Sequence, residues 1–403
     1  MSDIEVRTAE AAEFEAVQAV FGGAMMFDAT PDDLGRQLFE PERTLVAVDG
    51  GEVIGTTRAL TRELSVPGAV VDAAHVTGVG VRATHRRRGV MSSLIGRQLR
   101  EVPEAIAVLW ASESAIYGRF GYAGAAWGIG YEIELHRVGP TNERIRPGEL
   151  GELTVDDALK ELPPLLRRLQ AQRPGVSGRS DLGWQKHLQD KPDERNGRLA
   201  RQILVHRDEA GTIDGYALWR GKMNWTATGP ANEVNLEELV APDPTAYRAL
   251  WQHLLTMDLS AKLSYGYAAV DEPLQQLVST PTALDRRLNE SLWLRITDVP
   301  RALQGRRYVV PINVVLDVTD DLIQSNTGHF HLTADGDTVT CERTDAPADL
   351  ALSITELGAV YLGGRPLTEF AATGRVTEQT PGTLNQTTAA FGWPVAPASL
   401  EIF

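Results

Sequence analysis

The chain has little cysteine, no long apolar segment and an N-terminus without the features of a leader. Cys341 is the single cysteine among 403 residues, which excludes an intramolecular disulfide framework and is typical of a reducing cytoplasm. No apolar run approaches the roughly 20 residues that a membrane-spanning helix needs. The first residues, MSDIEVRTAEAAEF, are acidic, so we expect no signal peptide. We therefore predict a cytoplasmic protein without a membrane partner.

Positive charge is also scarce. Lys and Arg number 39 against 54 Asp and Glu, and the formal net charge is -15. This balance argues against a nucleic-acid partner, because a phosphate backbone binds basic surfaces. It suits a cationic substrate, which the field of the protein would attract; the alternative, that the charge only keeps the protein soluble, stays open. The length exceeds one ordinary core, so we expect two or three domains.

Residues 76–122 combine a predicted strand, a basic loop and a predicted helix. Val76–Arg82 is expected to be the strand, and the apolar spacing within Ser92–Glu101 indicates the helix. Three consecutive arginines and Gly89 lie between them. A helix N-terminus binds phosphate, arginine forks match phosphate oxygens, and glycine allows a ligand to come close. These features predict a pyrophosphate site whose glycine spacing is that of neither a Walker loop nor a dinucleotide fingerprint.

The loop Arg86-Arg87-Arg88-Gly89-Val90-Met91 resembles the R/Q-x-x-G-x-G/A loop of GNAT acetyltransferases, which holds the pyrophosphate of acetyl-CoA. Met91 departs from that pattern, because Gly or Ala is usual there. The segment ASESAIYGRFGY at 111–122 is similar to the corresponding stretch of the Eis (enhanced intracellular survival) family. Members of that family are multi-acetylating aminoglycoside N-acetyltransferases, and the resemblance extends to Phe403.

The resemblance implies an α/β (α+β) chain with two tandem GNAT-like domains and a sterol-carrier-like α+β domain. We expect a catalytic domain at 1–140, a degenerate GNAT-like domain at 141–299 and the sterol-carrier-like domain at 300–403, whose terminus reaches the active site. Trp127–Leu135 is expected to end the first domain. The second domain's loop, Ala241-Pro242-Asp243-Pro244, has neither glycine nor arginine, which favours a structural role, although a different ligand stays open. A homohexamer is implied by the resemblance alone.

Cofactor-binding residues are expected along the strand, the loop and the segment that follows. Glycines 78 and 80 lie within the strand, and glycine in a strand marks the close approach of a ligand or of another backbone. The alternative is a plain core strand with a bulge. In GNAT proteins this strand splays from its neighbour and pairs with pantetheine. The resemblance thus implies a set of acetyl-CoA contacts: Val79, Gly80, Val81, Arg86, Arg87, Arg88, Gly89, Val90, Met91, Ser92, Ser112 and Glu113.

Tyr117 and Phe403 are the expected catalytic residues. Acetyl transfer to an amine needs a proton donor for the departing thiolate, and the resemblance gives that role to Tyr117, while Tyr122 is expected only to pack. The resemblance also implies that the base is the carboxylate of the last residue, Phe403. An ordinary α-carboxyl has a pKa of about 3.5, and desolvation raises it. The rival bases are Glu401 and the acids near Asp28.

The acceptor is expected to meet Phe27, Asp28 and Glu401. The segment MMFDATPDDLGRQLFE lies where a GNAT fold binds its acceptor, although a solvated helix face is the simpler explanation for any single one of its acids. Two other functions stay open: acetylation of lysines on proteins or peptides, and a non-enzymatic scaffold that binds an apolar ligand. His329 and His331 alternate on one predicted strand, but a zinc site needs further ligands, so no metal is expected.

Overall fold

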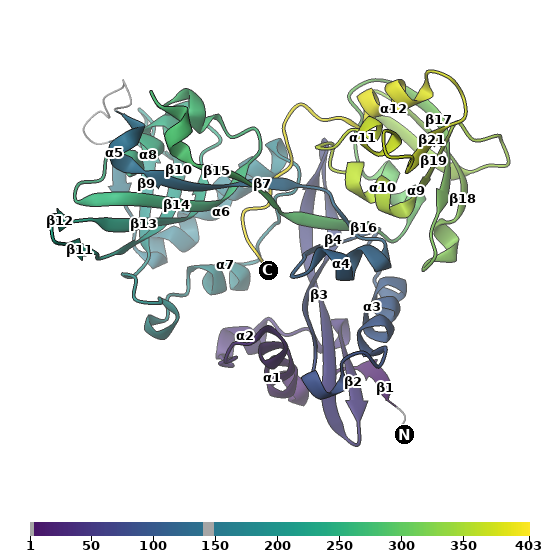
Figure 1. Ribbon diagram of the computed structural model, residues 1–403, viewed down its shortest axis with the longest axis horizontal. Helices are drawn as coiled ribbons and strands as arrows, with labels where there is room; N and C mark the ends of the chain where they lie inside the picture. Colours follow the sequence, from purple (N-terminus) through teal and green to yellow (C-terminus); the bar gives the residue numbers. More distant parts are fainter. Residues whose placement is uncertain (1–3, 140–148) are drawn as a thin grey trace. The chain divides into compact units, whose positions relative to one another are not determined.

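The computed structural model describes residues 4–139 and 149–403. The chain divides into two compact units, and the colours of Figure 1 follow its course from the N-terminus to the C-terminus. The first unit contains Met1–Ala126, Leu292–Pro394 and Phe403, and the second contains Trp127–Ser291 and Val395–Ile402. Each unit is built around a seven-stranded sheet, and the first unit carries an additional C-terminal domain.

The sheet of the first unit has the order β1-β2-β3-β4-β5-β16-β6. Its pairs are antiparallel except for β4 with β5, which is parallel. The strands are β1 (Glu5–Thr8), β2 (Thr44–Asp49), β3 (Glu52–Val66), β4 (Ala69–Val81), β5 (Ile106–Trp110), β16 (Leu292–Ile296) and β6 (Ala123–Gly124).

Helices cover both faces of this sheet. They are α1 (Phe14–Met25), α2 (Asp33–Gln37), α3 (Val90–Glu101) and the single turn α4 (Ser114–Tyr117). A Cβ at Gly80 would meet Ala24 of α1 at 2.9 Å, whereas one at Gly55 would meet Val90 of α3 at 2.9 Å. Because Gly55 pairs with Val81, the neighbour of Gly80, the two helices pack on opposite faces, as Figure 1 shows.

One strand lies in a different sheet from the one we expected. Trp127–Glu134, expected to end the first domain, is β7, and it pairs with β14 and β15 in the sheet of the second unit. In the first sheet, β16 pairs with both β5 and β6. The sequence of β7 alternates and that of β16 is a short apolar run, and although both patterns are typical of strands, neither specifies which sheet the strand joins.

The sheet of the second unit has the order β15-β7-β14-β13-β10-β9-β8. The strands are β15 (Arg286–Glu290), β7, β14 (Ser260–Ala269), β13 (Asn232–Val240), β10 (Ile213–Lys222), β9 (Gln202–Arg207) and β8 (Leu150–Glu152); β11 (Trp225–Thr226) and β12 (Gly229–Pro230) form a small hairpin. The helices are α5 (Leu135–Val138), α6 (Val155–Gln172), α7 (Asp181–Leu188) and α8 (Pro244–Leu255).

The N-terminus of α8 is capped by its own chain. Asp243 accepts a hydrogen bond of 2.7 Å from the backbone N–H of Thr245, and this bond lowers the pKa of the Asp243 carboxyl. A carboxylate therefore takes the position that a phosphate occupies at an anion-binding helix. This arrangement agrees with the expectation that the loop at 241–244 holds no pyrophosphate.

The C-terminal domain of the first unit begins with α9 (Val299–Gln304) and contains a five-stranded sheet of order β19-β18-β17-β20-β21. We expected this sheet to be antiparallel, but β17 and β20 are parallel. Buried side chains such as Phe330 and Phe391 fill the space between sheet and helices. The strands are β17 (Ile312–Thr319), β18 (Gly328–Asp335), β19 (Thr338–Arg343), β20 (Leu350–Ser353) and β21 (Val376–Glu378), and the helices are α10 (Ile354–Val360), α11 (Leu367–Ala371) and α12 (Thr383–Phe391).

Across residues 4–139 and 149–403, no helix combines the length and the apolar character needed to cross a bilayer. The longest helix considered above, α6, carries several charged residues along its 18 positions.

Candidate active site

A cavity of about 770 Å³ lies in the first unit, among the end of α1, the C-terminal half of β4, the start of α3 and the segment around α4. This volume is in the usual range for small-molecule sites. Most residues predicted to contact acetyl-CoA line it: Val79, Gly80, Val81, Arg86, Arg87, Gly89, Val90, Met91, Ser92, Ser112 and Glu113. The structure therefore brings together residues of β4, of the loop before α3 and of the segment before α4, which are separate in the sequence.

The edge of β4 is open beside this cavity. In the described chain, β4 pairs with β5 at Ala74 and His75, whereas its pairing with β3 continues to Val81. Among the residues that the structure describes, 76–81 therefore have no strand partner for their backbone groups on the β5 side. Such an edge can hydrogen-bond an extended ligand by β-type pairing.

Contacts and backbone geometry within the protein explain why β4 contains two glycines. Gly78 has φ +61° next to a register shift between β3 and β4, which is a bulge that favours glycine. Gly80 allows α1 to approach, because a Cβ there would lie 2.9 Å from Ala24 Cβ. Of the explanations that the sequence left open, a bulge accounts for Gly78 and the close approach of another element accounts for Gly80.

The arginine loop ends in two residues with left-handed backbone. Arg87 has φ +61° and Gly89 has φ +80°, and Gly89 precedes α3 without a side chain that caps the helix. The first N–H groups of α3 lack partners within the helix, so they are available for an anion in the cavity. Arg86 donates a bond of 3.2 Å to the carbonyl of Ala24, at the end of α1.

Arg88 differs from the other two arginines. It is absent from the cavity lining, and its Nη1 donates to Asp49 Oδ2 at 3.3 Å. His85 Nε2 lies 3.3 Å from the same oxygen. Arg88 thus helps to hold the loop, while Arg86 and Arg87 face the cavity together with Arg119, which the sequence did not indicate.

Tyr117 lies on the cavity wall. It ends α4, the turn that follows β5, and is 6% exposed. Burial raises the pKa of its hydroxyl, and a hydrogen bond with Ser112 opposes that shift. The phenol therefore stays protonated at neutral pH, as a proton donor must.

Tyr122 is a neighbour with a different environment. The two rings are 6.1 Å apart at their centroids and nearly perpendicular. Tyr122 is 0% exposed and is not part of the cavity lining. Its hydroxyl has no hydrogen-bond partner in the described parts of the chain. The geometry agrees with the expectation that Tyr122 packs.

Phe403 contacts β3 and β4 of the first unit. Thr77 Oγ1 donates a hydrogen bond of 2.9 Å to the terminal O of Phe403. The Phe403 ring lies 4.6 Å from the His75 ring, and the Arg62 guanidinium lies 5.7 Å from the Phe403 ring centroid. His75 and Thr77 lie on one face of β4 because they are two residues apart. None of these three contacts was predicted.

The residues just before Phe403 belong to the second unit, where Glu401 is ion-paired. Arg179 Nε donates to Glu401 Oε2 at 3.0 Å, and Arg179 also bonds Glu238 through two nitrogens. Leu400 is buried in the core of this unit. Glu401 therefore anchors the C-terminal segment on its own unit, which makes it a poor choice as base or acceptor contact, since protonation would break the pair.

The acids of the expected acceptor segment have different partners. Asp32 accepts a bond of 2.6 Å from the N–H of Gly35 and caps α2, and Glu40 accepts a bond of 3.0 Å from the N–H of Thr61. Phe27 and Asp28 are exposed and follow Met25 and Met26, which line the cavity. Asp28 is thus the acid of this segment closest in sequence to the cavity.

The two histidines of β18 have partners within their own domain. His329 Nδ1 lies 2.8 Å from the carbonyl of Ala346, and His331 Nε2 lies 2.7 Å from Asn313 Oδ1. In residues 4–139 and 149–403, no group of three or more His, Cys, Asp or Glu side chains is arranged to hold a metal ion.

Comparison with known families identifies three domains in the chain. A model described as an acetyltransferase (GNAT) domain matches residues 5–125, and a second model with that description matches residues 175–296. A sterol carrier protein domain matches residues 299–399. The chain therefore consists of two GNAT domains followed by a sterol-carrier-like domain, in the order that we expected.

Individual relatives are similar over nearly the whole length. An uncharacterized N-acetyltransferase of Streptomyces avermitilis is 37% identical over 394 residues, which cover 95% of each chain. N-acetyltransferase Eis of Mycobacterium tuberculosis is 30% identical over 386 residues, covering 89% of this chain and 91% of its own. The crystal structure of Eis1 from Mycobacterium abscessus superposes with a TM-score of 0.84 at 33% identity, covering 99% of this chain and 100% of that one.

Proposed function

Because the chain belongs to the Eis family of GNAT N-acetyltransferases, which use acetyl-CoA as co-substrate, we propose that it acetylates amines of small cationic acceptors such as aminoglycosides. Tyr117 is the general acid of this proposal, and the carboxylate of Phe403 is the general base. The first GNAT domain carries the reaction, and the second supports the fold. Family membership likewise supports a cytoplasmic homohexamer as a proposal.

The observation that carries this proposal is that Tyr117 and the arginine loop line the same cavity. Arg86, Arg87 and the N-terminus of α3 would bind the pyrophosphate. The open edge of β4 would bind the pantetheine arm, which brings the thioester toward Tyr117. Its hydroxyl is protonated and would donate its proton to the sulfur as the thiolate departs.

The base must remove a proton from the acceptor ammonium before or during attack. A carboxylate at Phe403 would accept it, directly or through water. Thr77 donates to this group, and the aromatic contacts with His75 and Arg62 would fix its position.

The acceptor class is proposed from charge. A chain of net charge -15 attracts polyamines, and Asp28 with Phe27 is exposed next to residues of the cavity wall. A carboxylate beside an aromatic ring suits an ammonium group on a hydrophobic ring or sugar.

The test is release of free CoA thiol from acetyl-CoA with a panel of amines. The panel contains an aminoglycoside, a linear polyamine, a lysine-containing peptide and a neutral sugar without an amine. We expect turnover with the aminoglycoside at the highest kcat/KM and none with the neutral sugar. Preference for the peptide would instead favour the lysine acetyltransferase alternative. If none of the amines is acetylated, the proposal is contradicted.

The arginine loop gives a first prediction. The double change Arg86→Ala and Arg87→Ala, which removes the two loop arginines that line the cavity, is expected to weaken acetyl-CoA binding at least about tenfold, because each hydrogen bond to a charged group is worth about 1.5–3 kcal/mol. Titration calorimetry measures the affinity. The matched control removes the same charge from the other end of α3, with Arg97→Ala and Arg100→Ala, and should leave affinity nearly unchanged. If both double variants lose acetyl-CoA affinity equally, the cause is the change in net charge and not the loss of specific contacts in the loop.

A further inference from the structure

The active-site cavity carries more positive charge than the loop before α3 supplies. Its lining contains Arg86, Arg87 and Arg119, whereas Glu113 is the one carboxylate among the described residues that line it. This excess is local, because the chain as a whole has a formal net charge of -15. A basic cavity in an acidic protein raises the local concentration of anionic ligands. The lining therefore marks an anion site that extends beyond the loop.

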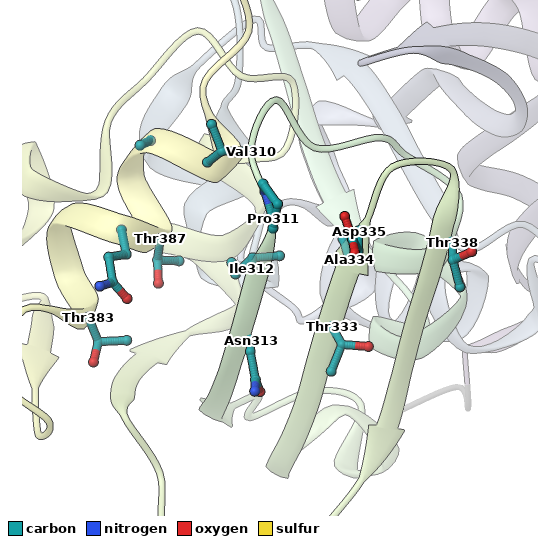
Figure 2. Close-up of a pocket in the computed structure, with 12 residues that line it drawn as sticks. Val310, Pro311, Ile312, Asn313, Thr333, Ala334, Asp335, Thr338, Thr383 and Thr387 are labelled. Atoms are coloured by element: carbon teal, nitrogen blue, oxygen red, sulfur yellow. The ribbon is translucent and has the colours of Figure 1, made fainter.

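Another cavity of similar size does not have this charge. It lies in the C-terminal domain between α12 and the sheet, has a volume of about 710 Å³ and is shown in Figure 2. Asp335 is the single charged residue among the described residues of its lining, which include no Lys, Arg or His. Arginines are thus specific to the cavity beside Tyr117 in this pair, which relates them to the ligand that binds there.

Arg119 comes from a different segment of the chain than the two loop arginines. It lies in the 3₁₀ turn Gly118–Phe120, which directly follows α4, and it is two residues beyond Tyr117. Tyr117 is 6% exposed, whereas Arg119 is exposed. Acetyl-CoA extends from the thioester, which we place beside the buried Tyr117, to an adenosine that carries a 3′-phosphate. An exposed residue of the cavity wall suits the adenosine end of this molecule.

No carboxylate in residues 4–139 and 149–403 forms an ion pair with Arg119. Its Nε donates a hydrogen bond of 3.4 Å to the carbonyl of Ile116, and its Cζ lies 5.8 Å from the centroid of the Phe120 ring. These contacts orient the guanidinium without neutralising it, and its two terminal nitrogens remain for phosphate oxygens. Arg88 is different, because it bonds Asp49 and lies outside the cavity lining.

The pyrophosphate of acetyl-CoA has sufficient partners without Arg119. The N–H groups at the start of α3 bind one anionic group, and Arg86 and Arg87 lie beside them. His85 also lines the cavity, but its Nε2 lies 3.3 Å from Asp49 Oδ2. The 3′-phosphate is a separate phosphomonoester with a charge of about -1.5 to -2 at pH 7. Arg119 is the cation of the described lining that is left to bind it.

We propose that Arg119 binds the 3′-phosphate of acetyl-CoA and so selects the acetyl donor. This inference rests on the proposed placement of acetyl-CoA in this cavity. Acetyl-dephospho-CoA lacks the 3′-phosphate, and so does the phosphopantetheine arm of an acyl carrier protein. The site therefore selects free acetyl-CoA over thioesters that have the same reactive end.

The test compares the dissociation constants of CoA and dephospho-CoA, measured by titration calorimetry on the full chain. The unaltered protein should bind CoA about tenfold more tightly, because a charged hydrogen-bond partner is lost with the phosphate. Arg119→Ala should weaken CoA alone and make the two affinities nearly equal. Arg119→Lys keeps the charge but not the planar fork, and it should give an intermediate ratio.

The matched control is Arg100→Ala. Arg100 is also exposed and also donates to a carbonyl of its own helix, that of Gly96 at 2.8 Å, but it does not line the cavity. Its removal should leave the ratio of the two dissociation constants unchanged. Both alanine variants should melt near the temperature of the unaltered protein, because each removes an exposed side chain.

The double variant Arg86→Ala and Arg87→Ala separates this inference from the proposed cofactor site. It should lose affinity for CoA and dephospho-CoA alike and keep their ratio. If it binds both ligands normally, acetyl-CoA lies elsewhere, and the cofactor site and this inference fail together. If it loses affinity, but the unaltered protein does not distinguish the two ligands or Arg119→Ala leaves their ratio unchanged, the assignment of the 3′-phosphate to Arg119 alone is wrong.

Discussion

Tyr117→Phe is expected to lower kcat about 10²–10⁴-fold, the usual worth of a general acid, with acetyl-CoA affinity nearly unchanged. The substitution keeps the ring and its packing and removes only the hydroxyl. Steady-state kinetics gives kcat, and calorimetry gives the affinity for acetyl-CoA. Because only proton donation to the thiolate is lost, the effect should fall on kcat and not on binding.

Tyr122→Phe is the matched control for this change. It removes a hydroxyl of the same chemistry from a ring 6.1 Å away, one that is buried without a partner among the described residues. We expect normal turnover and an equal or higher melting temperature, because an unpaired buried hydroxyl costs free energy. If Tyr122→Phe lowers kcat and Tyr117→Phe does not, Tyr122 is the general acid and Tyr117 the packing residue.

The pH dependence of Tyr117 follows from the direction of its pKa. Burial raises this pKa above the ordinary value of 10.0. The hydroxyl therefore keeps its proton at neutral and mildly alkaline pH, and the donor is lost only as pH rises through the raised value. The kcat profile should thus show no alkaline decline near neutrality from this group. An alkaline decline centred near pH 8 that disappears in Tyr117→Phe would contradict the assignment.

The local parts of the site were accessible from the sequence. The arginine loop and the segment around Tyr117 are each contiguous in the sequence, so their residue types and spacing can be read without knowledge of the fold. The family, the order of the three domains, the enzyme class and the use of acetyl-CoA are confirmed. The sequence left open whether a ligand, another backbone or a bulge explains the glycines of β4, because a sequence does not show that α1 packs against Gly80.

The non-local parts were not accessible. Thr77 and Phe403 are 326 positions apart, and nothing in the alternation of β4 distinguishes His75 and Thr77 from core residues. The placement of β7 and β16 depends on pairing between distant strands, for which both have equally suitable patterns. Arg179 was missed for the same reason, since its partners Glu238 and Glu401 come from separate regions of the second unit.

Masking the carboxylate of Phe403 is expected to reduce kcat by about 10²-fold or more without unfolding the protein. A C-terminal tag keeps the aromatic ring but converts the carboxylate into a peptide amide, which cannot accept a proton. Deletion of Phe403 moves the carboxylate to Ile402 and removes the ring that contacts His75 and Arg62. Both changes should abolish most turnover, measured beside the melting temperature of each protein.

Phe403→Leu separates the carboxylate from the ring. This variant keeps a terminal carboxylate and the hydrogen bond from Thr77, but it loses the aromatic contacts that hold the end of the chain. If the carboxylate is the base, this variant should retain much more activity than the tagged protein. If Phe403 only packs, the order reverses, because the tag preserves the ring and the leucine does not. A tagged enzyme with full turnover and an unchanged pH profile would leave Asp28 as the next base to test, since Glu401 is engaged by Arg179.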